Sequence, residues 1–296
     1  MRFLIPCEAP NKYNFHLHYG SFIKGLRAHG HEVISWGKAN GLDYTTKKLP
    51  TAMDAIAALR PDVYIVVNPF VDWFQVLEIG RKYPSLIIVG CIPDFHYRPR
   101  MSRFECCDLA LLRAQKHIAS VGEDSRIRWY PFSVDEDVLP AFVPWADRHN
   151  KVFFAGAAQH HIYPARARAL DILAGNRGTL LGATGYLGYK VYLEKLSNAK
   201  FALSCQSAYG IQPAKLVEYA AAGTIPLFDE AEYAQAIIPN VLGYVPNDIL
   251  NTFKNELNNT GWEAKARANR AHVLEHHTHR VRARQLLDWI ERPHGI

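Results

Sequence analysis

The sequence predicts an α/β protein with two domains, each built on a parallel sheet that helices cover. Short β-branched runs alternate with helical segments up to about residue 132, and the same alternation starts again at residue 151. Between these two series, residues 133–150 hold prolines and charges with little periodicity, which indicates an interdomain linker. We therefore expect a first domain over residues 1–140, a second over 150–278, and a C-terminal helix over 279–296.

The individual elements follow from the same patterns. In the first series, the apolar runs predict strands at 2–6, 31–36, 62–69, 85–94, 107–112 and 126–132. Helical spacing predicts helices at 19–31, 51–60 and 71–83, the first ending at a glycine. In the second series, strands are expected at 151–157, 178–183, 200–205 and 224–229, and helices at 165–173, 190–199 and 213–223. Two arginine-rich helices, 262–275 and 279–291, are expected to pack across the hinge.

Composition narrows the class of protein. The chain has 296 residues, a formal net charge of +6, and a dense basic stretch over residues 265–284, which suits anionic ligands. Its five cysteines are odd in number and form no CxxC pair, so we expect reduced thiols and no metal site. No apolar run approaches the roughly 18 residues of a membrane-spanning helix. We therefore expect a cytoplasmic protein with no transmembrane segment.

The segment 204–228, SCQSAYGIQPAKLVEYAAAGTIPLF, carries the most chemical information. Pro213 can open a helix without losing a hydrogen bond, which leaves the amides of the first turn free to face an anion. Lys215 adds a cation to that turn, and Glu218 offers a carboxylate that could accept both hydroxyls of a ribose. The alternative is a surface lysine and glutamate on an ordinary amphipathic helix.

Three motifs in this sequence resemble those of GT-B glycosyltransferases. KLVEYAAAGTIPL, over 215–227, resembles the helix that binds the donor, in particular that of glycogen-synthase-like retaining enzymes and spore-maturation-type domains. RWYPFSVDEDV, over 128–138, resembles the end of the family's first domain, and KVFFAGA, over 151–157, resembles the first strand of its second. The resemblance implies two Rossmann-like domains facing a central cleft, with a C-terminal helix crossing back.

The resemblance also implies roles for matched residues. Glu218 would bind the donor ribose, while Lys215 would bind the diphosphate with the helix amides near Pro213 and Ala214. The backbone would approach the diphosphate at Gly156. A second cation would come from Arg166, which we prefer to Arg168.

Further glycines complete the expected donor site. Gly210 lies in the loop before the donor helix, and Gly20 stands just before a helix whose N-terminus would face the phosphates. The loop GATGYLG, over 182–188, would lie against the base, and it lacks the GxG spacing of a dinucleotide fingerprint.

The acceptor is expected in the first domain, beyond the carboxyl ends of its strands. His18, Asp94 and His96 follow such strands, so they are the candidate catalytic residues that would contact the acceptor hydroxyl or take its proton. For each of them a structural role is an open alternative. The histidines at 160, 161, 276, 277 and 279 suggest a metal cluster on paper, but we expect surface histidines.

Two departures bear on the chemistry. Retaining members often carry an acidic residue seven positions before the ribose-binding glutamate, where this chain has Ile211. The run Asp135-Glu136-Asp137 imitates a metal-binding DxD, but its place in the linker predicts solvated charge. A GT-B enzyme would instead stabilise the leaving diphosphate with a helix dipole and cations.

The resemblance thus implies transfer of a sugar from a nucleoside diphosphate sugar, expected to be a UDP-sugar, to an acceptor hydroxyl. Retention of configuration, with no metal and no other cofactor, is the expected course, and inversion, with Asp94 or a nearby histidine as the base, is left open. One alternative is a DNA-modifying enzyme acting on a hydroxymethylated base, which the basic loop 97–103 and the arginine-rich C-terminus would serve. Another is a non-catalytic module that binds sugar nucleotides, and an epimerase is a third.

Overall fold

The computed structural model describes residues 1–7, 19–37, 42–67, 73–92, 106–113, 115, 118, 124–156, 158, 161–183, 187–206 and 214–292. Contacts between Cα atoms divide the chain into two units. Unit 1 comprises residues 1–131 and 279–296, and unit 2 comprises residues 132–278. Each is an α/β unit with a parallel sheet, which confirms the predicted fold class.

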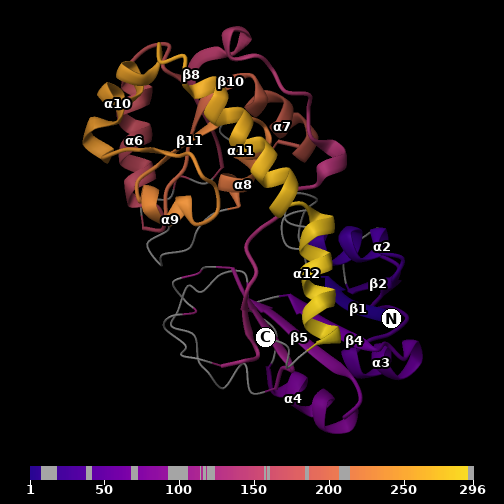
Figure 1. Ribbon diagram of the computed structural model, residues 1–296. Helices are drawn as coiled ribbons and strands as arrows, with labels where there is room; N and C mark the ends of the chain where they lie inside the picture. Colours follow the sequence, from indigo (N-terminus) through magenta and orange to yellow (C-terminus); the bar gives the residue numbers. More distant parts are fainter. Residues whose placement is uncertain are drawn as a thin grey trace. The chain divides into compact units, whose positions relative to one another are not determined.

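Unit 1 is built on a seven-stranded sheet in the order β3-β2-β1-β4-β5-β6-β7, with every strand pair parallel. The strands are β1 (Arg2–Cys7), β2 (Glu32–Gly37), β3 (Tyr44–Thr45), β4 (Val63–Val67), β5 (Ile87–Ile92), β6 (Leu109–Leu112) and β7 (Ile127–Trp129). Side chains alternate between the two faces, because Phe3 and Ile5 enter one apolar cluster while Leu4 enters another. Helices therefore cover both faces (Figure 1).

The helices of unit 1 are η1 (Ser21–Gly25), α2 (Leu26–Ala28), α3 (Ala52–Leu59), α4 (Trp73–Lys82) and α12 (His279–Glu291). Helix α3 begins with a capping box in which Thr51 and Asp54 satisfy each other's backbone amides. The helix predicted at 19–31 is a π-helical turn followed by one α-helical turn.

Helix α12, near the end of the chain, belongs to unit 1, where Figure 1 draws it in yellow beside α2. Two glycines permit this close packing. A Cβ at Gly25 would stand 2.3 Å from the carbonyl oxygen of His279, and a Cβ at Gly20 would stand 2.3 Å from Nε2 of the same residue. Gly20 thus has a packing role in unit 1, and its predicted part in donor binding stays a prediction.

Unit 2 is built on a five-stranded parallel sheet in the order β12-β11-β10-β8-β9. Its strands are β8 (His149–Ala155), β9 (Leu180–Ala183), β10 (Ala199–Leu203), β11 (Ile225–Phe228) and β12 (Leu242–Gly243). The helices are η3 (Glu136–Val138), η4 (Trp145–Asp147), α6 (Pro164–Gly175), α7 (Tyr189–Ser197), α8 (Lys215–Ala221), α9 (Ala231–Gln235), η5 (Pro246–Asp248), α10 (Ile249–Glu256) and α11 (Trp262–His276).

The segment predicted as a linker, 133–150, belongs to unit 2. Trp145 is 5% exposed within the core of this unit, where its ring meets Phe201 edge to face. Asp135 is 2% exposed, and its Oδ1 accepts the backbone N–H of Asp137 at the start of η3. The prediction that Asp135 is a solvated charge is therefore wrong, because the carboxylate is buried as a helix cap.

Helix α8 ends against two arginines, of which one is buried and the other partly buried. The Arg148 side chain is 4% exposed and donates to the carbonyls of Gly223 at 2.6 Å and Ala222 at 3.4 Å, as well as to Val143 and Ala199. Arg270 of α11 donates to the carbonyl of Ala221 at 2.6 Å. Cations at the C-terminal end of a helix satisfy its unpaired carbonyls and complement its dipole. These contacts hold α8 in place.

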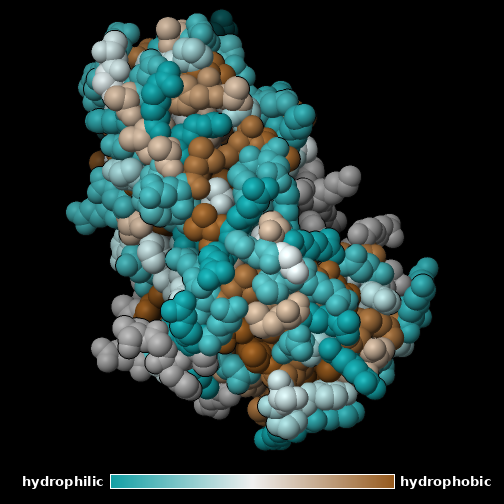
Figure 2. Space-filling view, turned by 45° about the vertical axis from the view of Figure 1, so that its right-hand side comes forward, coloured by the Kyte–Doolittle hydropathy of each residue, from teal (hydrophilic) through white to brown (hydrophobic). Residues whose placement is uncertain are grey.

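The surface is mostly polar. On the face drawn in Figure 2, polar and charged side chains (teal) separate the apolar ones (brown). Isolated exposed apolar side chains are normal on folded proteins. Within the described part of the chain, none of the helices has the length and the apolar character that crossing a bilayer requires.

Replacing Arg148 by alanine should destabilise unit 2. The substitution leaves buried carbonyls at the end of α8 without donors, so we expect the free energy of unfolding to fall by about 3 kcal/mol. Urea denaturation, with hydrogen exchange of peptides from α8, measures the effect. Arg177→Ala, at an exposed arginine of the same unit, is the control and should change stability by less than about 0.5 kcal/mol. An Arg148→Ala protein as stable as this control would contradict the capping role.

Candidate functional site

Unit 2 has a switch point between β8 and β10. Strand β9, which follows β8 in the chain, pairs with one edge of β8, and the next strand, β10, pairs with the other edge. In open parallel sheets, ligands bind at such a point beyond the carboxyl ends of the strands. Gly156 directly follows β8 at this edge, and the first residue of α8, Lys215, reaches the same strand end. Three predicted donor-site residues, Gly156, Lys215 and Glu218, therefore lie together.

The ammonium of Lys215 is held at the end of β8. Its Nζ donates to the carbonyl of Ala155 at 2.6 Å and lies 5.2 Å from the centre of the Tyr192 ring. Gly156, with φ at +134°, leaves room for this side chain, because a Cβ there would stand 3.1 Å from Nζ. A side chain at residue 156 would therefore crowd the ammonium of Lys215.

The surroundings of Lys215 make its charge easy to remove. Burial lowers the pKa of Lys215 to about 8, the Glu218 carboxylate raises this pKa, and the Arg166 guanidinium lowers it. At neutral pH the ammonium is still the main form. An anion bound beside it would favour the charged form further.

The carboxylate of Glu218 is buried and oriented by a tyrosine. The residue is 1% exposed, and its Oε2 accepts the hydroxyl hydrogen of Tyr192, on α7, at 3.0 Å. Tyr192 is itself 3% exposed. The position of this carboxylate is thus coupled to α7.

Arg166 brings a second cation to the cluster. It lies in the first turn of α6, is 2% exposed, and stacks its guanidinium 3.9 Å from the centre of the Tyr163 ring. It also hydrogen-bonds to Cys205, just beyond β10, where burial raises the pKa of the thiol to about 11. By contrast, Arg168 is hydrogen-bonded to Asn247 at 2.9 Å. Of the two arginines considered, Arg166 is the one that the structure brings to the cluster.

Two comparisons bear on this arrangement. Residues 159–288 match the model of a family described as glycosyl transferase-like. No curated protein sequence matches the chain. The matched segment contains Arg166, Tyr192, Lys215 and Glu218.

Solved structures share the fold over nearly the whole chain. One is AviGT4, a glycosyltransferase involved in avilamycin A biosynthesis, with 16% identity and a TM-score of 0.68 over 99% of this chain and 98% of that chain. Another is Anabaena HepE in complex with UDP and glucose, with 11% identity and a TM-score of 0.69 over 98% of this chain and 99% of that chain. Sucrose-phosphate synthase from Thermosynechococcus elongatus has 11% identity and a TM-score of 0.69 over 99% of both chains.

This chain has the GT-B fold of glycosyltransferases. The family match and the shared fold agree with the resemblance read from the three motifs. The narrower assignment to the spore-maturation branch stays a prediction.

Several predicted site residues of this GT-B chain lie outside the described residues. These include the three candidate catalytic residues and two residues of the donor loop: His18, Asp94, His96, Gly210 and Pro213. Ala214 is described and forms the N-cap of α8, whose first residue is Lys215. The donor role of Ala214 stays a prediction.

Of the five histidines predicted to be surface residues, His161 and His276 are exposed as predicted, His160 lies outside the described residues, and two differ from the prediction. His277 is 4% exposed and His279 is 1% exposed, so these two are not surface residues. They lie at the end of α11 and the start of α12, where chain packing covers them. Among the described residues, no group of three His, Cys, Asp or Glu side chains could hold a metal ion.

Tyr192 is the residue of the cluster that sequence reasoning missed. It contacts both Lys215 and Glu218, yet in the sequence it is one aromatic among several on an amphipathic helix. Its spacing from Tyr189 and Leu196 predicts a core position just as well. Only the placement of α7 beside α8 distinguishes a core position from a position in the cluster.

The charge coupling in this cluster gives a prediction for Lys215. We expect its amine to titrate near pH 8 in NMR of methyl-labelled lysines, well below the ordinary lysine value of about 10.4. Glu218→Gln should lower the Lys215 pKa further, because it removes the carboxylate that favours the ammonium. Between the folded value of about 8 and the ordinary value of 10.5, the unfolded chain binds more protons. Stability should therefore rise with pH across this window. A Lys215 midpoint above 10 would contradict the assignment.

Proposed function

We propose that the protein transfers a sugar from a UDP-sugar to an acceptor hydroxyl with retention of configuration and without a metal ion. The observation that supports this most is the cluster of Lys215, Arg166 and Glu218 at the switch point of unit 2. Two cations and a carboxylate on one strand edge match the charges of a nucleoside diphosphate and the hydroxyls of its ribose. HepE, which shares the fold, has been crystallised with UDP and glucose.

The cations would act on the leaving group. When the bond to the sugar breaks, negative charge develops on the diphosphate, and fixed cations near that position lower the barrier. Lys215 would supply such a charge at the end of β8, and Arg166 would supply a second from α6. Since binding a diphosphate favours the ammonium form, the pKa of Lys215 should rise in the complex.

Glu218 would bind the ribose. The hydroxyl of Tyr192 keeps one carboxylate oxygen in a fixed position, which limits the entropy lost when a ribose binds. The side chain is 1% exposed, so this role requires that the groups covering Glu218 move when the nucleotide enters. On the acceptor side, we propose His18, Asp94 and His96 as the residues that contact the incoming hydroxyl.

The DNA-modifying alternative has no support in the described residues. The loop 97–103 lies outside them. Of the C-terminal cations, Arg267 and Arg284 are exposed but form ion pairs with carboxylates one turn away, Arg270 binds the carbonyl of Ala221 at the end of α8, and Arg282 is 4% exposed. These four side chains are therefore paired or buried.

Binding of UDP tests the proposal directly. Lys215→Met removes one charge-assisted contact to the diphosphate, so we expect UDP affinity in calorimetry to fall about 10- to 100-fold. Lys254→Met, at an exposed lysine of α10, should leave the affinity unchanged. In the wild type, the affinity should decline above about pH 8, where free Lys215 loses its proton. Lys215→Arg should flatten that decline.

The outcomes separate three possibilities. UDP binding together with release of UDP from a UDP-sugar supports a transferase. Tight UDP binding with no turnover on any acceptor would favour the non-catalytic module. Loss of UDP affinity to the same extent in both lysine variants would contradict the assignment of Lys215.

Tyr192→Phe tests the orientation of Glu218. The variant loses the hydroxyl that donates to the carboxylate, and we expect UDP to bind about 3- to 10-fold more weakly. The matched control is Tyr244→Phe, whose hydroxyl donates to the carbonyl of Ser204 at 3.1 Å. Both variants should lose some stability in thermal denaturation, but only Tyr192→Phe should lose nucleotide affinity. Equal affinities would mean that Tyr192 has a packing role alone.

A further inference from the structure

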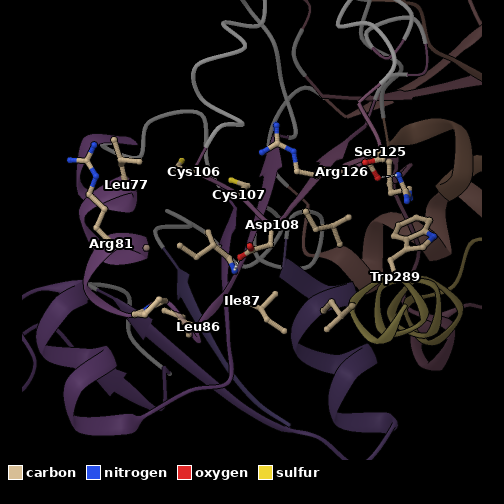
Figure 3. A pocket seen from close by; sticks show the side chains of 16 residues that line it. Leu77, Arg81, Leu86, Ile87, Cys106, Cys107, Asp108, Ser125, Arg126 and Trp289 are labelled. Atoms are coloured by element: carbon tan, nitrogen blue, oxygen red, sulfur yellow. Dashed lines mark hydrogen bonds between the residues drawn. The ribbon is translucent and has the colours of Figure 1, made fainter. Parts of the chain in front are cut away.

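Unit 1 contains a pocket of about 560 Å³ that the proposed function does not use. Figure 3 shows it between the end of α4, the starts of β5, β6 and β7, and the last turns of α12. A volume of this size falls in the range of pockets that hold small organic ligands, roughly 300 to 1,000 Å³.

The place of this pocket in the sheet separates it from a transfer site. Ile87, Leu109 and Arg126 lie at or just before the first residues of β5, β6 and β7, so the pocket opens at the amino ends of these strands. Substrates of parallel α/β sheets bind at the opposite, carboxyl edge. A ligand here would leave that edge free.

The wall of the pocket is apolar over much of its extent. Leu77 comes from α4, Leu86 and Ile87 from the start of β5, and Trp289 and Ile290 from α12. In Figure 3 the Trp289 ring lies on the side of α12, across the pocket from Leu77. A ligand with an apolar body would remove these surfaces from water.

Three guanidinium groups accompany this apolar wall. Arg126 is fixed by a bidentate pair with Asp124, at 2.7 and 3.1 Å, which raises its pKa and keeps it charged. Arg128 donates to the carbonyls of Ser125 and Ile127, and Arg81 extends from the last turn of α4.

Among the described residues, one carboxylate lines the pocket. Oδ2 of Asp108 accepts the backbone N–H of Ile88 at 2.7 Å. With Arg126 paired to Asp124, the guanidinium groups of Arg81 and Arg128 remain against the carboxylate of Asp108. An anionic head group would be attracted to these two guanidinium groups.

We propose that this pocket binds a small organic anion that has an apolar body and a single carboxylate, phosphate or sulfonate head. The apolar body lies against Leu77, Ile87 and Trp289, and the head lies beside Arg81, which Figure 3 shows on the same side of the pocket as Leu77. The inference is independent of nucleotide binding, because every lining residue belongs to unit 1.

The pocket contains its own reporter of occupancy. Cys106 lines it and is partly exposed, whereas Cys7, Cys91, Cys107 and Cys205 are buried. A thiol reagent such as N-ethylmaleimide should therefore modify Cys106 first. A molecule in the pocket should slow that reaction.

The probe for the test is 8-anilinonaphthalene-1-sulfonate, an aromatic monoanion that fluoresces when it leaves water. With the full folded chain at neutral pH, we expect one saturable site and slower alkylation of Cys106 in the presence of the probe. Leu77→Glu places a carboxylate on the wall and should weaken binding about 10-fold or more. Arg81→Gln, at an exposed position that is safe for folding, should weaken it about 3- to 10-fold.

Two matched controls lie on the same helix. Lys82 is adjacent to Arg81 but does not line the pocket, and Phe74 is 81% exposed outside it. Lys82→Gln and Phe74→Glu should change the affinity less than about twofold. The proposal is overturned if the probe does not saturate, if it leaves the alkylation of Cys106 unchanged, or if Leu77→Glu and Arg81→Gln bind it as the controls do.

Discussion

The candidate site depends on how one short helix is held. Helix α8 has seven residues, and a helix of that length is not stable alone in water. Its position comes from burial of Leu216, Val217 and Tyr219 and from the arginines that bind its last carbonyls. Gly223, with φ at +73°, ends the helix where a Cβ would strike Phe142 and Arg148. Because this end is fixed, the other end can hold Lys215 against β8.

Much of the architecture could be predicted from local patterns. Except for the two-residue edge strands β3 and β12, which were not predicted, the strands of both units lie within a few residues of the predicted apolar runs, since strands buried on both faces have a continuous apolar composition that loops lack. The segment 133–150 has no such apolar run, so its burial in unit 2 was not predicted. It has no periodicity because it forms short 3-10 turns, η3 and η4, and its burial comes from the distant Phe201 and Ala199. Local composition carries no signal for such contacts.

The site was predictable to the extent that its chemistry lies in one motif. Lys215 and Glu218 stand three residues apart on one helix, so their proximity follows from helical geometry. Tyr192 and Arg166 lie on other helices, and the fold shows that Tyr192 donates to Glu218 and that the Arg166 guanidinium lowers the pKa of Lys215. Burial could not be predicted from residue type either, because His277 and His279 carry polar rings, yet both are covered by their neighbours. No pattern around them predicts this.

Charge in this chain is used in two distinct ways. Several of the C-terminal cations that contribute to the net charge of +6 bind carbonyls or carboxylates of the same chain, so net charge alone is a poor guide to a partner. Lys215 differs because burial brings its pKa to about 8, close to neutral pH. A lysine in that range stays mostly charged at neutral pH and loses its charge above about pH 8, unless a bound anion favours the ammonium. Above that pH, binding of a dianionic ligand would therefore be linked to uptake of a proton by Lys215, whereas binding of a neutral ligand of the same shape would not.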